Sequence, residues 1–218
     1  MGRRRHRWLH LVHPAALAPL AVGVWDFVTG RLSANPIQDI TYRSGYTALV
    51  LLVLSLACTP ASSLLGQKWA IKLRRPLGLY AFLYAAIHLL IFAVLDYGLD
   101  LGLIWQTVQE KRYVVAGLAA LLLLVPLAVT STKGWQRRLG KRWKALHRLV
   151  YLAAPLAVIH FVWLVKSDYR EPLLYGAAVA ALLCLRLPPV RRLAAALHER
   201  VRVESGAASH RSSGSHLQ

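Results

Sequence analysis

The chain has 218 residues, of which 56% are hydrophobic, and its mean hydropathy is +0.43. It also carries 27 Lys and Arg residues against 9 Asp and Glu residues, a formal net charge of +18. A nucleic-acid-binding protein needs a basic groove or stripe on a soluble fold, whereas these basic residues fall between apolar stretches. The combination argues against a nucleic-acid partner and predicts an all-α integral membrane protein with basic loops in a lipid bilayer.

Six apolar stretches follow one another along the chain. They run from Leu9 to Val28, Tyr42 to Thr59, Leu77 to Leu95, Tyr113 to Ser131, Leu146 to Val165 and Pro172 to Leu187. A helix needs about 20 residues to cross roughly 30 Å of hydrocarbon. The first five stretches reach or approach that length and the sixth is the shortest, so the sequence predicts a six-transmembrane-helix bundle.

The two ends of the chain differ from this apolar region. Residues 1–8 hold four arginines, and no persuasive small-residue cleavage site follows them, so we expect a basic cytoplasmic N-terminus and an uncleaved first helix. Residues 9–190 form the predicted transmembrane domain. Residues 191–218 are basic and then rich in Ser, Gly and His without apolar periodicity, which predicts a disordered cytoplasmic tail.

The basic residues are divided unequally between the two predicted sides. With the N-terminus inside, only six of the 27 lie in the outer segments, namely Arg31, Arg43, Lys111, Arg112, Lys166 and Arg170. Short cytoplasmic loops carry an excess of Lys and Arg, so this bias predicts that both termini are cytoplasmic. Seven of the 9 acidic residues lie near the outer face, which leaves the inner surface strongly cationic.

Three histidines, His88, His147 and His160, lie inside predicted membrane helices. An ionisable side chain at such depth is costly and marks a functional site by default. His88 lies about 11 residues into the third helix and His160 about 14 into the fifth, roughly 17 Å and 21 Å from the inner surface. Imidazoles at similar depths on two helices can hold one haem iron from opposite sides. Haem b held in this way needs no CxxCH motif, and the chain has none.

His147 precedes His160 by 13 residues on the same helix. The separation is about 20 Å along the axis, so the two cannot share one iron. A second haem near the inner face would need a partner for His147, and His13 in the first helix has the right depth. Arg74, Arg75 and Arg148 ring the inner mouth, where they can pair with haem propionates or a flavin phosphate, or act as ordinary cytoplasmic charges.

No GxGxxG or GxxxxGK[ST] motif occurs, so no nucleotide-binding module is expected on this chain. Electrons would come from a lipid-soluble donor or a separate protein, and the final catalytic centre would lie on a partner. The sequence thus favours an electron-transfer subunit over an enzyme. Two alternatives remain: a stand-alone ferric or quinone reductase, and a small transporter without haem whose histidines relay protons.

Several local segments resemble one known family. They are Asn35–Ile40, Arg74–Leu79, Tyr84–His88, Thr130–Ser131, Leu139–Trp143, Leu146–Tyr151 and Ile159–Trp163. These segments resemble the haem-binding membrane subunits of the periplasmic methionine-sulfoxide reductase system, the MsrQ family of the ferric-reductase-like transmembrane group. The resemblance covers about residues 8–190, in order and with matching spacing, and is most specific between Leu139 and Trp163.

The resemblance implies a multi-pass protein of the bacterial inner membrane that carries haem b and FMN. It also implies that electrons pass from the quinone pool to a periplasmic molybdopterin-containing reductase, which repairs methionine sulfoxide in envelope proteins. The family's haem-ligand histidines fall on His88, His147 and His160, and its first-helix histidine matches His13. The wider group often spaces such histidine pairs 14 residues apart. The spacing here departs from that pattern and leaves the haem count at one or two.

Overall fold

The computed structural model of the chain describes residues 10–187, and every regular element in that range is helical. The predicted N-terminal segment (1–8) and tail (191–218) lie outside the described residues. The elements are α1 (Val12–Val28), α2 (Pro36–Leu64), α3 (Ala70–Leu90), the π-helical η2 (Ile91–Asp96), α4 (Leu101–Glu110), α5 (Arg112–Val129), α6 (Lys133–Leu139), α7 (Lys141–Leu146), the 3₁₀-helical η3 (His147–Leu149), α8 (Val150–Leu164) and α9 (Arg170–Cys184). Within the described residues, each of the six predicted apolar stretches coincides for most of its length with a helix.

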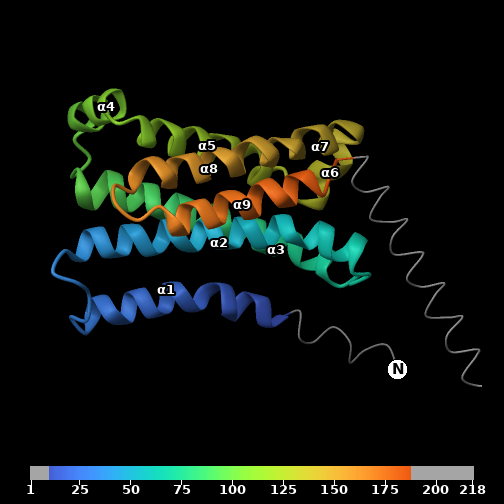
Figure 1. Ribbon diagram of the computed structural model, residues 1–218, viewed down its shortest axis with the longest axis horizontal. Helices are drawn as coiled ribbons and strands as arrows, with labels where there is room; N and C mark the ends of the chain where they lie inside the picture. Colours follow the sequence, from blue (N-terminus) through green and yellow to red (C-terminus); the bar gives the residue numbers. More distant parts are fainter. Residues whose placement is uncertain (1–9, 188–218) are drawn as a thin grey trace, which may run out of the picture.

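Four helical runs within residues 10–187 are long and apolar enough to cross a membrane. They are α2, α3 with η2 (Ala70–Asp96), α5, and α7 through α8 (Lys141–Leu164). Helix α1 is apolar but has 17 residues, and α9 has 15. Both run alongside the longer helices in one bundle (Figure 1). The described chain is thus a multi-pass membrane protein with four candidate spans, beside which the shorter helices α1 and α9 run.

Three spans begin earlier than the apolar pattern predicts. Helix α2 starts at Pro36 rather than Tyr42, α3 at Ala70 rather than Leu77, and the fifth predicted helix at Lys141 rather than Leu146. The added turns of the last two carry Lys and Arg residues, whose long side chains can place their charges in the polar boundary while the helix continues. Helices α4 and α6 were not predicted, because their 10 and 7 residues are too short for a span.

Fully buried alanines lie in the core of the bundle. Helix α2 packs most extensively on α3, and α5 packs on α8. Ala81 of α3 is 1% exposed, and Ala153 and Ala154 of α8 are 0% exposed. Small side chains let membrane helices approach closely and gain van der Waals contact. The two helix pairs, α2–α3 and α5–α8, form the frame around the candidate site.

Tyr84 of α3 fastens α1 to this frame. Its side chain is buried, and its hydroxyl donates to the Ala16 carbonyl at 2.8 Å and accepts from the Leu20 amide at 3.0 Å. Those two backbone groups are partners in a regular α-helix. The hydroxyl therefore lies between the Ala16 carbonyl and the Leu20 amide, which would otherwise bond to each other in α1, and this position is next to Pro19.

The two ends of the bundle differ in charge. All seven acidic residues of the described range lie at the end formed by the α1–α2 loop, α4 and the α8–α9 loop (Figure 1). There, Arg43 pairs with Asp26 at 2.6 Å and with Asp39 at 2.8 Å. The α2–α3 turn, α6 and α7 lie at the opposite end. Together with the first turns of α3, η3 and Arg186, they carry most of the described lysines and arginines. We refer to these as the acidic end and the basic end.

Candidate functional site

The structure brings His88 and His160 together between the two helix pairs. His88 comes from α3 and His160 from α8, and their ring centroids lie 6.0 Å apart with an angle of 86° between the ring planes. Both residues are half-buried. Two imidazoles that are far apart in the sequence thus lie next to each other inside the bundle, with their ring planes nearly perpendicular.

Each of these rings is held by a backbone carbonyl of the neighbouring helix. The His88 Nδ1 lies 2.8 Å from the Thr41 carbonyl oxygen on α2, and the His160 Nδ1 lies 2.6 Å from the Tyr113 carbonyl oxygen on α5. A carbonyl can only accept, so Nδ1 carries the hydrogen in both rings. This tautomer leaves the lone pair of Nε2 free for a metal. Within residues 10–187 no hydrogen bond reaches either Nε2.

Glycines make room for both rings. Gly45 and Gly117 each lie four residues after the carbonyl residue, on the same helical face. A Cβ at Gly45 would lie 3.0 Å from the His88 Nδ1, and one at Gly117 would lie 2.6 Å from the His160 Nδ1. The sequence reasoning missed both glycines. The available signal was an isolated glycine within an apolar helix, which often has a packing reason.

The donor set fits a haem better than a bare metal ion. Two imidazoles on opposite sides of one metal, with metal–nitrogen bonds of about 2.0–2.1 Å, place their centroids about 6 Å apart. A structural metal ion usually takes four protein ligands, and no cluster of three or more His, Cys, Asp or Glu occurs in the described range. A porphyrin supplies four nitrogens of its own, so two histidines complete its iron.

The histidine pair lies toward the acidic end. His88 lies 18 residues after Ala70 and eight before Asp96, and His160 lies four residues before the end of α8 at Leu164. At 1.5 Å per residue, His88 is about 12 Å from the acidic end of its helix and about 27 Å from the basic end. The π-helical η2 begins three residues after His88, and such segments are frequent at functional sites.

The other two predicted ligands have different neighbours. The His147 Nδ1 lies 3.1 Å from the Trp143 carbonyl oxygen, and the ring stacks on the indole with centroids 3.9 Å apart. The Nδ1 of His13 lies 3.0 Å from the Tyr80 hydroxyl. No hydrogen bond or ring contact joins His13 to His147 in the part of the chain that the structure describes.

The three predicted cofactor-binding arginines differ in burial. Arg74 on α3 is half-buried, whereas Arg75 and Arg148 are exposed. Arg74 lies close enough to His147 for the two to interact electrostatically. Of the three, Arg74 is therefore the one directed into the bundle.

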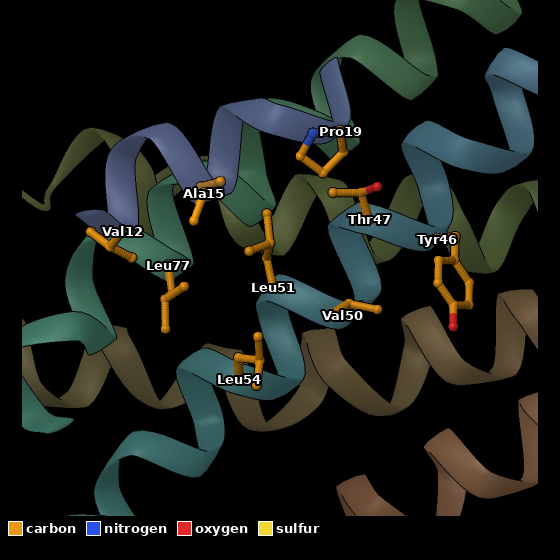
Figure 2. A pocket seen from close by; sticks show the side chains of 10 residues that line it. Val12, Ala15, Pro19, Tyr46, Thr47, Val50, Leu51, Leu54 and Leu77 are labelled. Carbon is orange, nitrogen blue, oxygen red and sulfur yellow. The ribbon is translucent and has the colours of Figure 1, made fainter. Parts of the chain in front are cut away.

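An apolar groove lies between α1, α2 and α3 (Figure 2). Its volume is about 360 Å³, and no histidine lines it. Its walls are almost entirely apolar and include Val12, Ala15, Pro19, Val50, Leu54 and Leu77. The groove therefore offers no metal ligand and is distinct from the site of His88 and His160.

The comparison with known proteins identifies the family. The family described as ferric reductase like transmembrane component matches residues 44–158. Proteins named "Protein-methionine-sulfoxide reductase heme-binding subunit MsrQ" are similar over most of the chain. The one from Xanthomonas axonopodis pv. citri is 48% identical, covering 81% of this chain and 84% of the relative. The one from Rhodospirillum rubrum is 50% identical, covering 83% and 88%.

The chain belongs to the MsrQ family. A third relative with the same name, from Deinococcus radiodurans, is 48% identical over 81% of this chain and 88% of its own length. The ferric-reductase-like match includes His88 and His147 and ends two residues before His160. No solved structure matches the chain. The resemblance noted in the sequence is thus confirmed, and the MsrQ relatives are haem-binding subunits by name.

Proposed function

We propose that this MsrQ-family chain is a membrane electron-transfer subunit that binds haem b between His88 and His160. The observation that carries the proposal is the pair of neighbouring imidazoles, whose ring centroids lie 6.0 Å apart and whose Nδ1 atoms each lie on a backbone carbonyl. The names of its relatives support haem binding. A bound haem supplies reversible one-electron chemistry through its iron.

The residues around the pair have defined tasks. The carbonyls of Thr41 and Tyr113 fix the two ring orientations and raise the basicity of each Nε2. Gly45 and Gly117 let the rings lie against the backbones of α2 and α5. Because both hydrogen-bond acceptors are backbone carbonyls of packed membrane helices, the two imidazoles are held rigidly before the cofactor binds.

A second haem and a flavin belong to the same proposal. His147, with its Nδ1 on Trp143, is the proposed ligand of a second haem nearer the basic end, and His13 is its predicted partner. FMN is expected from the family resemblance. Arg74, Arg75 and Arg148 are proposed to bind the acidic groups of these cofactors, with Arg74 the best placed by burial.

The distribution of charge supports an orientation. We propose six membrane-crossing helices within residues 9–190, both termini in the cytoplasm, and the acidic end in the periplasm of a bacterial inner membrane. His88 and His160 then lie toward the periplasm. In this arrangement the chain takes electrons from the quinone pool and delivers them to a periplasmic molybdopterin-containing methionine sulfoxide reductase. The final catalytic centre lies on that partner, so this chain is not itself the enzyme.

The test is the reduced-minus-oxidised optical spectrum of the purified protein, with haem measured per chain. We expect b-type bands in wild type and their loss in His88→Ala and in His160→Ala. A partial loss in His147→Ala would indicate the second haem. His10→Ala is the control, because His10 is exposed at the start of the described chain.

Two outcomes would change the assignment. Reduction of ferric chelates by the isolated chain, without a partner, would favour a stand-alone reductase. A wild-type protein without haem, made under haem-replete expression, would overturn the electron-transfer mechanism in favour of a histidine proton relay.

A further inference from the structure

Arg186, at the C-terminal end of α9, has buried donors without partners. One terminal nitrogen (NH2) donates to the Leu56 carbonyl at 2.6 Å, and the guanidinium carbon lies 4.9 Å from the centroid of the Tyr151 ring. The remaining nitrogens, Nε and NH1, are buried and have no hydrogen-bond partner within residues 10–187. Buried donors of a charged group are almost always satisfied, so these two indicate a missing acceptor.

A second arginine, Arg74, reaches the same part of α2: its backbone carbonyl accepts a hydrogen bond from Ser55, the residue before Leu56. Arg74 of α3 is half-buried and interacts electrostatically with Arg186 and with Tyr151. Two like charges in a partly buried place repel each other unless an anion lies between them.

No carboxylate within residues 10–187 forms an ion pair with Arg74 or Arg186. All seven described acidic residues lie at the acidic end of the bundle, and both ion pairs found there involve Arg43. A carboxylate or other anion that balances these charges must therefore come from outside residues 10–187.

We propose that Arg74 and Arg186 form a binding site for a phosphate group, between α2, α3, α8 and α9 near the basic end. Guanidinium forks match phosphate oxygens, and two positive charges balance the one or two negative charges of a phosphate. The site lies at the boundary where anionic headgroups gather against basic residues. The source is either a phospholipid headgroup or the phosphate of a nucleotide cofactor such as FMN.

This site is separate from the histidine pair. Arg74 precedes His88 by 14 residues on one helix, a distance of about 21 Å. The inference extends the role proposed for Arg74 and adds Arg186, but it does not rest on His88 or His160. Haem content and phosphate binding can therefore fail independently.

The experiment compares matched ligands with and without phosphate. The full-length protein is purified in mild detergent, depleted of lipid and titrated with FMN against riboflavin, and with dioctanoyl phosphatidylglycerol against dioctanoylglycerol. We expect one phosphate-bearing ligand to bind at least about tenfold more tightly than its phosphate-free analogue. Which pair shows the difference identifies the source.

Three variants assign the effect to the guanidiniums. Arg186→Gln and Arg74→Gln should remove the preference for phosphate, whereas Arg137→Gln, an exposed loss of charge on α6, should keep it. Arg186→Lys keeps the charge but loses the fork, so we expect it to retain part of the preference. If Arg186→Gln does not accumulate, the preference for phosphate is compared between wild type, Arg186→Lys and Arg74→Gln.

Three results would overturn the proposal. The first is equal affinity of wild type for a ligand with and without phosphate in both pairs. The second is an unchanged preference in the Arg74 and Arg186 variants. The third is a loss of haem from Arg186→Gln with phosphate binding intact, which would assign the guanidiniums to a haem carboxylate instead.

Discussion

His88 and His160 each use one ring nitrogen for a backbone carbonyl and keep the other free. The two rings have equivalent surroundings. The residue whose carbonyl accepts the hydrogen bond lies 47 positions before its histidine in both cases, and a glycine follows that residue one helical turn later. A hydrogen bond to a carbonyl survives most side-chain substitutions, because the acceptor belongs to the backbone. Whether each ring fits therefore depends on the absence of a side chain at Gly45 and Gly117.

Gly117→Ala is expected to lower haem affinity sharply. The new methyl group would lie 2.6 Å from the His160 Nδ1, so the imidazole must leave the Tyr113 carbonyl. Overpacking of this kind costs about 1–3 kcal/mol, which corresponds to a roughly 5- to 150-fold loss of affinity. Haem per chain and the amplitude of the b-type bands measure the effect.

Graded controls separate this clash from other effects of the substitution. Gly45→Ala, with a contact of 3.0 Å, should lose less haem than Gly117→Ala. Gly23→Ala should lose none, because nothing lies within 4 Å of its Cβ position. Alanine favours a helix by about 1 kcal/mol over glycine, so a weakened helix does not explain a loss. A wild-type amount of haem per chain in Gly117→Ala would contradict the position assigned to the His160 ring against Gly117 and the Tyr113 carbonyl.

At the scale of single elements, α1 is attached mainly through side chains rather than through a long shared interface. Its contacts are with α2 and α3, and the Tyr84 hydroxyl is the buried polar link among them. Pro19 withholds one amide from the hydrogen-bond ladder of α1, so the helix is already weakened where the tyrosine enters.

Tyr84→Phe is expected to destabilise the protein by about 1–3 kcal/mol, because the Ala16 carbonyl and Leu20 amide lose a buried partner. The measurement is the midpoint of thermal unfolding in detergent, followed by tryptophan fluorescence. Tyr169→Phe, an exposed tyrosine, is the control and should leave the midpoint unchanged. Equal midpoints for wild type and Tyr84→Phe would show that the helix closes its own hydrogen bond there.

Across the whole molecule, charge separates the two ends of the bundle more clearly than any single contact does. The acidic end contains both described ion pairs, whereas the basic end contains Arg186, whose Nε and NH1 are buried without a hydrogen-bond partner in residues 10–187. Because cytoplasmic loops carry an excess of Lys and Arg, we expect the basic end to lie in the cytoplasm.

Thiol labelling tests this orientation. In a background carrying Cys58→Ala and Cys184→Ala, we expect Asp168→Cys to react with a membrane-impermeant maleimide in intact spheroplasts. Lys141→Cys should react only after lysis, because it lies at the basic end. The two variants control each other, since each is exposed. Labelling of Lys141→Cys before lysis, with Asp168→Cys protected, would reverse the topology.

Much of this architecture follows from the sequence alone. Hydrocarbon imposes long apolar helices because every backbone group must be satisfied internally, so the positions of α2, α3, α5 and α8 could be read from composition. The helix starts were misplaced, since charged turns at Ala70 and Lys141 remain helical at the membrane boundary. His88 and His160 could also be identified from the sequence, because an ionisable side chain in the membrane interior is costly in free energy and therefore indicates a functional site.

The tertiary structure alone decided which groups meet. Periodicity places a histidine on a helix, but only packing shows that the centroids of two rings lie 6.0 Å apart and that backbone carbonyls hold both rings. Gly45, Gly117 and Arg186 were not identified as site residues, because their roles depend on neighbours distant in the chain. Local sequence thus determines the helices and the costly residues within them, whereas long-range packing determines their partners.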